Sequence, residues 1–124
     1  MGKFLAGVGR VTITPPVGMY LIGMERSDVS HGLRDDLFAT ALAVSDGATE
    51  SVIVSMDVLV INPKTVERIR QAASALTGIP GENMMFCATH CHSGPIMYSF
   101  EDSQPMVRGY MENFTHLVIG AIRM

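Results

Sequence analysis

The sequence of 124 residues contains no tryptophan, only two cysteines and no extended run of like charges. Its nine lysines and arginines and twelve aspartates and glutamates leave a formal net charge of −3 without a basic stripe, so nucleic acid is not an expected partner. On an extended segment Cys87 and Cys91 are about 13 Å apart, at ~3.3 Å per residue, which is too far for a disulfide. Both cysteines are therefore expected to be reduced.

Long apolar runs are also missing. The chain reaches Arg10 before any apolar run attains the length of a signal-peptide core, and no stretch approaches the ~18 to 20 apolar residues that span a bilayer. The sequence therefore predicts a cytoplasmic protein without a transmembrane segment.

The composition that remains is that of a globular domain. Hydrophobic residues make up 48% and charged residues 17% of the chain, and there are no internal repeats or low-complexity tracts. We therefore expect one domain over residues 1–124.

Apolar patterns predict the secondary structure. Strands are expected over residues 4–14, 37–45, 51–61 and 83–89. A helix is expected from Pro63, with Asn62 as its N-cap, to the residue before Gly78, and a second helix from Pro105 onward. The order βββαβα predicts the α/β class with a mixed sheet, in which the helical crossover makes the third and fourth strands parallel.

The same patterns predict which side chains are buried. Alanines alternate along residues 37–45, which predicts a close neighbour on their side. The nearly continuous apolar run over 51–61 predicts a central strand covered on both faces. In the first helix Val66, Ile69, Ala73 and Leu76 form one stripe, and in the second helix Tyr110 falls on the apolar stripe, so these residues are expected in the core.

Two histidines carry the strongest chemical signal. The motif Thr-His-Cys-His-Ser-Gly-Pro at residues 89–95 directly follows a predicted strand. In an extended backbone, residues two apart point to the same side, so His90 and His92 can present two imidazoles to one point. Such a pair can chelate a divalent metal, or one ring can bind metal while the other polarises a substrate oxygen. Ordinary hydrogen-bonded histidines are the alternative.

Four blocks of the chain resemble the N-terminal domain of the neutral/alkaline (non-lysosomal) ceramidases. They are a glycine-rich strand that runs into an Ile-Thr-Pro turn at 7–18, the next strand at 32–33 and 37–41, a Ser-x-Asp strand end at 55–57, and the histidine block at 88–95. They occur in the family's order and cover nearly the whole chain.

The resemblance implies a zinc-dependent hydrolase of N-acyl amides, such as N-acylsphingosine. It matches His90 to a zinc ligand and His92 to an adjacent catalytic residue, although the two roles are exchangeable. In this family another histidine, a glutamate and a tyrosine from later in a longer chain complete the zinc shell. The sequence departs from the family at Cys91, where threonine is common, and at Thr40, where arginine is frequent.

Asp57 is the third candidate site residue and, after His92, the second candidate catalytic residue. It ends a buried strand on the side where α/β sheets place their sites, which suggests a carboxylate that orients a histidine. An aspartate that caps loop amides is the alternative. His31 and Asp35-Asp36 lie in the long loop over residues 17–36, where a solvated charge cluster is the simpler interpretation.

Two other functions stay open. One is a non-catalytic metal-binding or interaction module, and the other is a fragment of a different metal hydrolase, such as an amidohydrolase. The last helix has no stop signal, so the sequence resembles an incomplete catalytic domain that is inactive on its own. Exposed strand edges and apolar surface are expected to cause self-association.

Overall fold

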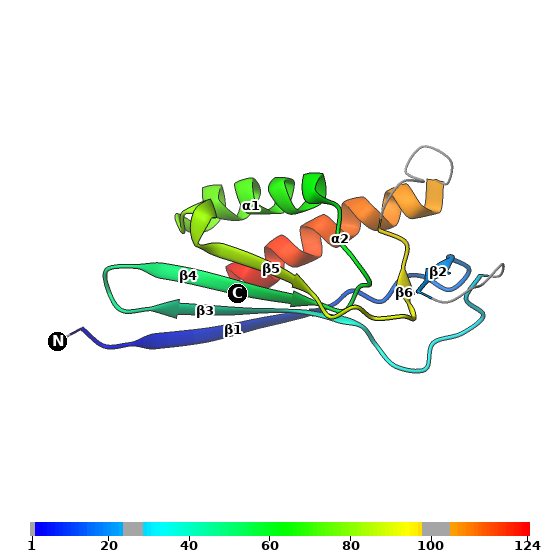
Figure 1. Cartoon of the computed structure of the whole chain (residues 1–124), viewed down its shortest axis with the longest axis horizontal. Coiled ribbons are helices and arrows are strands. Elements are labelled where there is room, and N and C mark those ends of the chain that lie inside the picture. Colours follow the sequence, from blue (N-terminus) through cyan, green and yellow to red (C-terminus); the bar gives the residue numbers. More distant parts are fainter. Residues whose placement is uncertain (1, 24–28, 98–104) are drawn as a thin grey trace.

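The computed structural model describes residues 2–23, 29–97 and 105–124. A four-stranded sheet in the order β1-β3-β4-β5 is built from β1 (Leu5–Thr12), β3 (Phe38–Ser45), β4 (Glu50–Met56) and β5 (Met84–Ala88). Two helices, α1 (Pro63–Thr77) and α2 (Pro105–Arg123), lie on one side of this sheet (Figure 1). A short 3-10 helix, η1 (Gly81–Asn83), precedes β5. A two-stranded ribbon of β2 (Leu21–Ile22) and β6 (Gly94–Pro95) lies beyond the end of the sheet.

This architecture confirms the predicted α/β class and mixed sheet. β1 pairs with β3 and β3 with β4 in antiparallel fashion, whereas β4 and β5, joined through α1, are parallel as predicted. The two-residue strands β2 and β6 were not predicted, because they are too short to show a period.

The ends of α1 follow the sequence signals. The side chain of Asn62 accepts a hydrogen bond from the backbone N–H of Lys64, and a proline occupies the first turn. Gly78 adopts the left-handed conformation, φ 79°, and its N–H donates to the carbonyl of Ser74.

The core lies between the sheet and α2. Ala39 and Ala41 are fully or nearly buried, which confirms the close neighbour predicted on the alanine side of β3. On β1 a Cβ added to Gly9 would lie 2.0 Å from the carbonyl oxygen of Ala121, so α2 packs directly on the strand backbone. No helix among the described residues is long and apolar enough to cross a membrane.

Tyr110 belongs to this core, as predicted. Its hydroxyl donates to the carbonyl of Ile13 at 2.6 Å, and burial raises the pKa of Tyr110 above its ordinary value. The hydroxyl therefore stays a hydrogen-bond donor that ties α2 to the segment after β1.

Two burial predictions are wrong, the first of them in part. In α1 Ile69 and Ala73 are buried as predicted, but Thr65 is buried with them, whereas Leu76 is 58% exposed. The helix is rotated from the predicted stripe because α2 packs beside it. The second error concerns β4, which is central but covered on one face only, with Ile53 44% exposed. Both helices pack on the same side, so nothing in the described chain covers the other face.

Candidate functional site

The candidate residues lie where the parallel strands β4 and β5 end. β4 runs into Asp57, and β5 runs through Thr89 into His90 and His92 before the chain enters β6 (Figure 1). The carboxyl ends of parallel strands are the usual place for a site in α/β sheets. The topology thus puts all three predicted residues at one end of the sheet.

The ring of His90 is held in a defined orientation. Its Nδ1 lies 3.1 Å from the carbonyl oxygen of Leu59. A carbonyl oxygen only accepts, so Nδ1 carries the proton and, in the neutral ring, Nε2 keeps its lone pair. The exposed His90 side chain therefore offers Nε2 as a metal ligand or a hydrogen-bond acceptor.

The two imidazoles lie next to each other. The ring centroids of His90 and His92 are 4.8 Å apart in an edge-to-face arrangement, with 75° between the planes. The extended backbone expected here is not found, because β5 ends at Ala88 and His90 has a left-handed backbone with φ 65°. A turn brings the rings together, and a non-glycine residue in that region costs on the order of 1 kcal/mol or more.

Backbone hydrogen bonds hold this turn against the segment after β4. The N–H of Thr89 donates to the carbonyl of Met56 at 2.9 Å, and that of Cys91 donates to Val58 at 3.2 Å. Together with the contact between His90 and Leu59, these bonds continue the pairing of β4 and β5 past the ends of the strands. These contacts therefore hold the strained turn in place at Thr89, His90 and Cys91.

Asp57 contacts the turn, but the hydrogen bonds seen for its carboxylate are to Phe38 and Thr89 and not to a histidine. One carboxylate oxygen accepts from the backbone N–H of Phe38 at 2.9 Å, and the other accepts from the hydroxyl of Thr89 at 3.2 Å. This is the arrangement of the capping alternative. Because Thr89 directly precedes His90, the hydrogen bond from Thr89 to Asp57 still helps to hold the histidine turn in place.

Gly23 is a site residue that sequence reasoning missed. It has φ 107°, and a Cβ at this position would lie 2.5 Å from the Cα of His92. The backbone at the end of β2 thus packs directly on His92. The only sequence signal was a glycine in an irregular loop, which says nothing about what it contacts.

A cavity opens beside the histidine block. It has a volume of about 420 Å³, and Ser93 lines it together with residues of the long loop that follows β1. Half of those residues are apolar, whereas Arg34 and Asp35 add charge; the apolar ones are Pro15, Val17, Leu21, Leu33 and Leu37. The cavity therefore lies between this loop and the histidine block.

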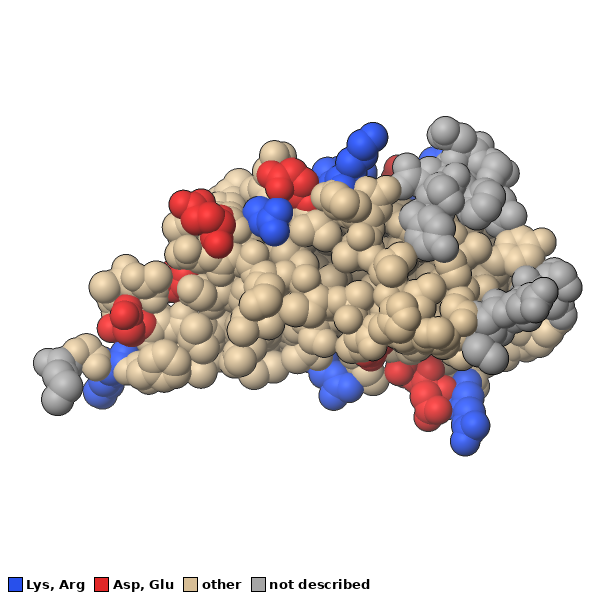
Figure 2. Space-filling model, in the orientation of Figure 1, with Lys and Arg blue, Asp and Glu red and all other residues tan. Residues whose placement is uncertain are grey.

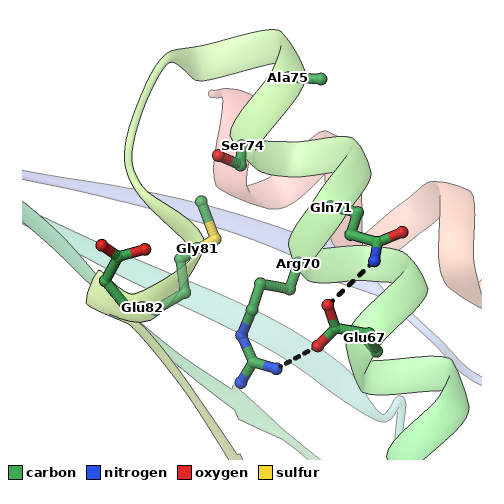
Figure 3. A pocket seen from close by; sticks show the side chains of 8 residues that line it. Glu67, Arg70, Gln71, Ser74, Ala75, Gly81 and Glu82 are labelled. Atoms are coloured by element: carbon green, nitrogen blue, oxygen red, sulfur yellow. Dashed lines mark hydrogen bonds and ion pairs between the residues drawn. The ribbon is translucent and has the colours of Figure 1, made fainter.

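A larger hollow of about 700 Å³ lies elsewhere, on the surface of α1 and η1 (Figure 3). There the Arg70 guanidinium pairs with Glu67 at 2.8 Å, and the Gln71 amide donates to the same carboxylate at 3.0 Å. None of the candidate residues line it. The charge of Arg70 is thus paired with Glu67, and we do not assign a function to this hollow.

Within residues 2–23, 29–97 and 105–124, no group of three or more histidine, cysteine, aspartate or glutamate side chains is arranged to hold a metal ion. Cys91 is a free thiol, and His116 lies on the exposed side of α2. The described residues therefore offer two imidazoles as possible metal ligands, fewer than the four ligands of a tetrahedral zinc site.

No family model matches the sequence. Solved structures with a similar fold include a neutral ceramidase from Pseudomonas aeruginosa, with a TM-score of 0.81 and 22% identity, and a ceramidase complexed with C2, with a TM-score of 0.69 and 24% identity. Each match covers 97% of this chain but only 21% and 20% of the respective ceramidase chain. The chain thus has the fold of about one fifth of a ceramidase.

Proposed function

We propose that this chain is part of the catalytic domain of a zinc-dependent hydrolase that cleaves N-acyl amide bonds. The observation that carries the proposal is the orientation of His90, whose Nδ1 donates to Leu59 and leaves Nε2 for a metal beside the His92 ring. The fold shared with ceramidases and the histidine motif support it.

Each residue has a role in this proposal. His90 would hold zinc through Nε2, with the Leu59 carbonyl fixing its tautomer as the partners of metal-bound histidines do. His92 would donate to the amide oxygen as negative charge develops there. Asp57 would position His90 through Thr89. Zinc, when bound, supplies a water of lowered pKa and stabilises the oxyanion.

The substrate is proposed to be a lipid amide, N-acylsphingosine or a related compound. The apolar lining of the cavity beside Ser93 suits an acyl chain. Two imidazoles cannot complete a zinc shell, so the remaining ligands would come from other parts of a longer protein, and we expect this chain alone to be inactive.

A second candidate is a non-catalytic metal-binding module, which the lack of a third ligand among the described residues favours. Hydrolysis of a fluorogenic N-acyl amide by a longer protein that contains this chain would exclude it. An amidohydrolase barrel is not favoured, because two of the three strand pairs in the main sheet are antiparallel, whereas such a barrel is built from parallel strands.

Zinc binding tests the proposed role of the histidine pair. We expect the purified chain to bind one zinc ion, and a His90→Ala, His92→Ala double variant to bind it at least about 100-fold more weakly. Loss of one hydrogen-bonding partner of a ligand already costs roughly 10- to 100-fold, and loss of the ligands costs more. Metal analysis and calorimetric titration provide the measurement.

His116→Ala is the matched control, since it removes an exposed imidazole on α2. It should leave zinc affinity within about twofold, while circular dichroism verifies that all variants fold. The pair is not a metal site in this chain if the folded wild type binds zinc no more tightly than the double variant.

Asp57→Ala tests the positioning role. The change leaves the Phe38 N–H without its acceptor and frees Thr89, so we expect unfolding to become easier by about 1.5–3 kcal/mol and zinc affinity to fall roughly 10-fold. Asp57→Asn keeps one oxygen acceptor, so it should lose less stability and less zinc affinity than Asp57→Ala. Equal zinc affinity in the wild type and both variants would contradict a positioning role. Urea denaturation and zinc titration measure the two effects.

A further inference from the structure

The turn between β3 and β4 contains Asp46-Gly47, the one place in the chain where glycine follows an aspartate or an asparagine. Both residues are exposed. The turn lies at the end of the molecule that also carries the N-terminus (Figure 1), and acidic and basic side chains stand on the surface there (Figure 2). It precedes β4, whereas the candidate site follows the end of this strand, so its chemistry is independent of the proposed hydrolase function.

An aspartate before a glycine can rearrange with water as the only co-reactant. The glycine backbone nitrogen attacks the side-chain carboxyl carbon, Cγ, so that an N–Cγ bond forms and one water leaves, made from the carboxyl O–H and the amide proton. A second water then opens the five-membered succinimide ring. Breaking the new N–Cγ bond restores aspartate, whereas breaking the original peptide bond gives isoaspartate, in which the main chain runs through Cγ. Glycine favours ring closure because no Cβ hinders its nitrogen.

The folded turn engages both reacting groups. The N–H of Gly47, which must lose its proton before the nitrogen attacks, donates to the hydroxyl oxygen of Ser45 at 3.1 Å. One carboxylate oxygen of Asp46 accepts from the N–H of Thr49 at 2.8 Å and from that of Ala48 at 2.9 Å. These two bonds, the one from Thr49 most of all, lower the pKa of the Asp46 carboxyl and favour its ionised form, which resists the attack. Ring closure therefore requires the turn to open.

We propose that Asp46 is a site of spontaneous conversion to isoaspartate, and that the hydrogen bond from Gly47 to Ser45 limits the rate by keeping the turn closed. The conversion adds one atom to the main chain. The N–H of Asp46 donates to the carbonyl of Thr49, so the added atom falls inside the loop that this bond closes. Because loop length fixes the register of a hairpin, the product disturbs the pairing of β3 with β4, which begins at Ser45 and Glu50.

Ageing of the purified chain for several weeks at neutral pH and body temperature tests the proposal. A protease that cuts before aspartate does not cut before isoaspartate, so loss of cleavage between Ser45 and Asp46 measures the conversion. We expect the chain unfolded in guanidinium chloride to convert at least about 10-fold faster than the folded chain, because only the open turn reacts. Ser45→Ala should speed conversion of the folded chain roughly fivefold, the effect on turn opening of losing one hydrogen bond. In guanidinium chloride its rate should equal that of the wild type.

Ser51→Ala is the matched control. It removes a hydroxyl from the same hairpin, at a position on β4 opposite Val44, and this hydroxyl makes none of the hydrogen bonds described for the turn. Its folded chain should convert within about twofold of the wild-type rate, and circular dichroism verifies that both variants fold.

Three outcomes would overturn the proposal. Equal rates in the folded and the unfolded wild type, or no conversion at Asp46 in either, would mean that the turn does not control such a reaction. An unchanged rate in folded Ser45→Ala would mean that the bond to Ser45 does not keep the turn closed. An increase in Ser45→Ala that is equally large in guanidinium chloride would be an effect of the neighbouring residue type and not of the turn.

Discussion

Replacing Gly9 with alanine is expected to lower the free energy of unfolding by about 3 kcal/mol. A Cβ at Gly9 would lie 2.0 Å from the carbonyl oxygen and 3.0 Å from the carbonyl carbon of Ala121. Those atoms are helix backbone, so no side-chain rotation relieves the overlap. α2 would have to move off β1, and this helix carries Phe114 and Val118, which are fully buried in the core.

Gly7→Ala is the matched control for this prediction. Gly7 lies two residues earlier in β1, on the same face, and a Cβ there would meet nothing within 4 Å. Its alanine variant should stay within about 0.5 kcal/mol of the wild type. Urea denaturation of both variants gives the comparison, and equal stability losses would show that close packing of α2 on Gly9 is not the cause.

The parts of the fold that the sequence predicted are those fixed by local chemistry. The ends of α1 are set by Asn62 and Pro63 at its start and by Gly78 at its end. These residues act on backbone groups of the first and last turns, so their effect is local and can be predicted from the sequence. The parallel pairing of β4 and β5 follows from the helix between them, since a hairpin could not connect parallel strands.

The errors concern contacts between elements. The predicted stripe of Val66, Ile69, Ala73 and Leu76 shares Ile69 and Ala73 with the observed one. The two differ by only a small rotation of α1, which the position of α2 selects. Likewise, Ile53 and its neighbours are apolar enough for burial on two faces. The apolar character of a sheet face does not indicate whether the same chain or another covers it.

The sequence predicted that the candidate residues lie near one another, but not their geometry. The sequence placed His90, His92 and Asp57 after adjacent strands, and the structure brings them to one end of the sheet. The sequence did not predict the left-handed backbone of His90 or its contact with the Leu59 carbonyl. Every residue has a backbone carbonyl, so the residue type at position 59 does not indicate this contact. Gly23 could not be found for a similar reason, since its role depends on a chain segment 69 residues away that only the fold brings near.

Gly23→Ala is expected to displace His92 and to lower the free energy of unfolding by about 2–3 kcal/mol. Two costs add here. Alanine is strained at φ 107°, and its Cβ would lie 2.5 Å from the Cα and 3.1 Å from the carbonyl carbon of His92. Because the obstacle is the backbone of His92, the turn that holds both imidazoles must shift. Under the proposed function, zinc affinity then falls roughly 10-fold.

Gly18→Ala separates the two costs of the Gly23 change. Gly18 has a similar backbone, φ 96°, but a Cβ there would meet nothing within 4 Å. Its alanine variant should therefore lose stability only through backbone strain, about 1 kcal/mol. The imidazole NMR signals of His92 report the displacement without any metal, and they should move in Gly23→Ala and stay in place in Gly18→Ala. If His92 signals and stability change equally in both variants, contact between Gly23 and His92 does not set the position of that ring. If His92 moves in Gly23→Ala while zinc affinity stays constant, the contact is real, but the displacement does not reach His90, the proposed zinc ligand.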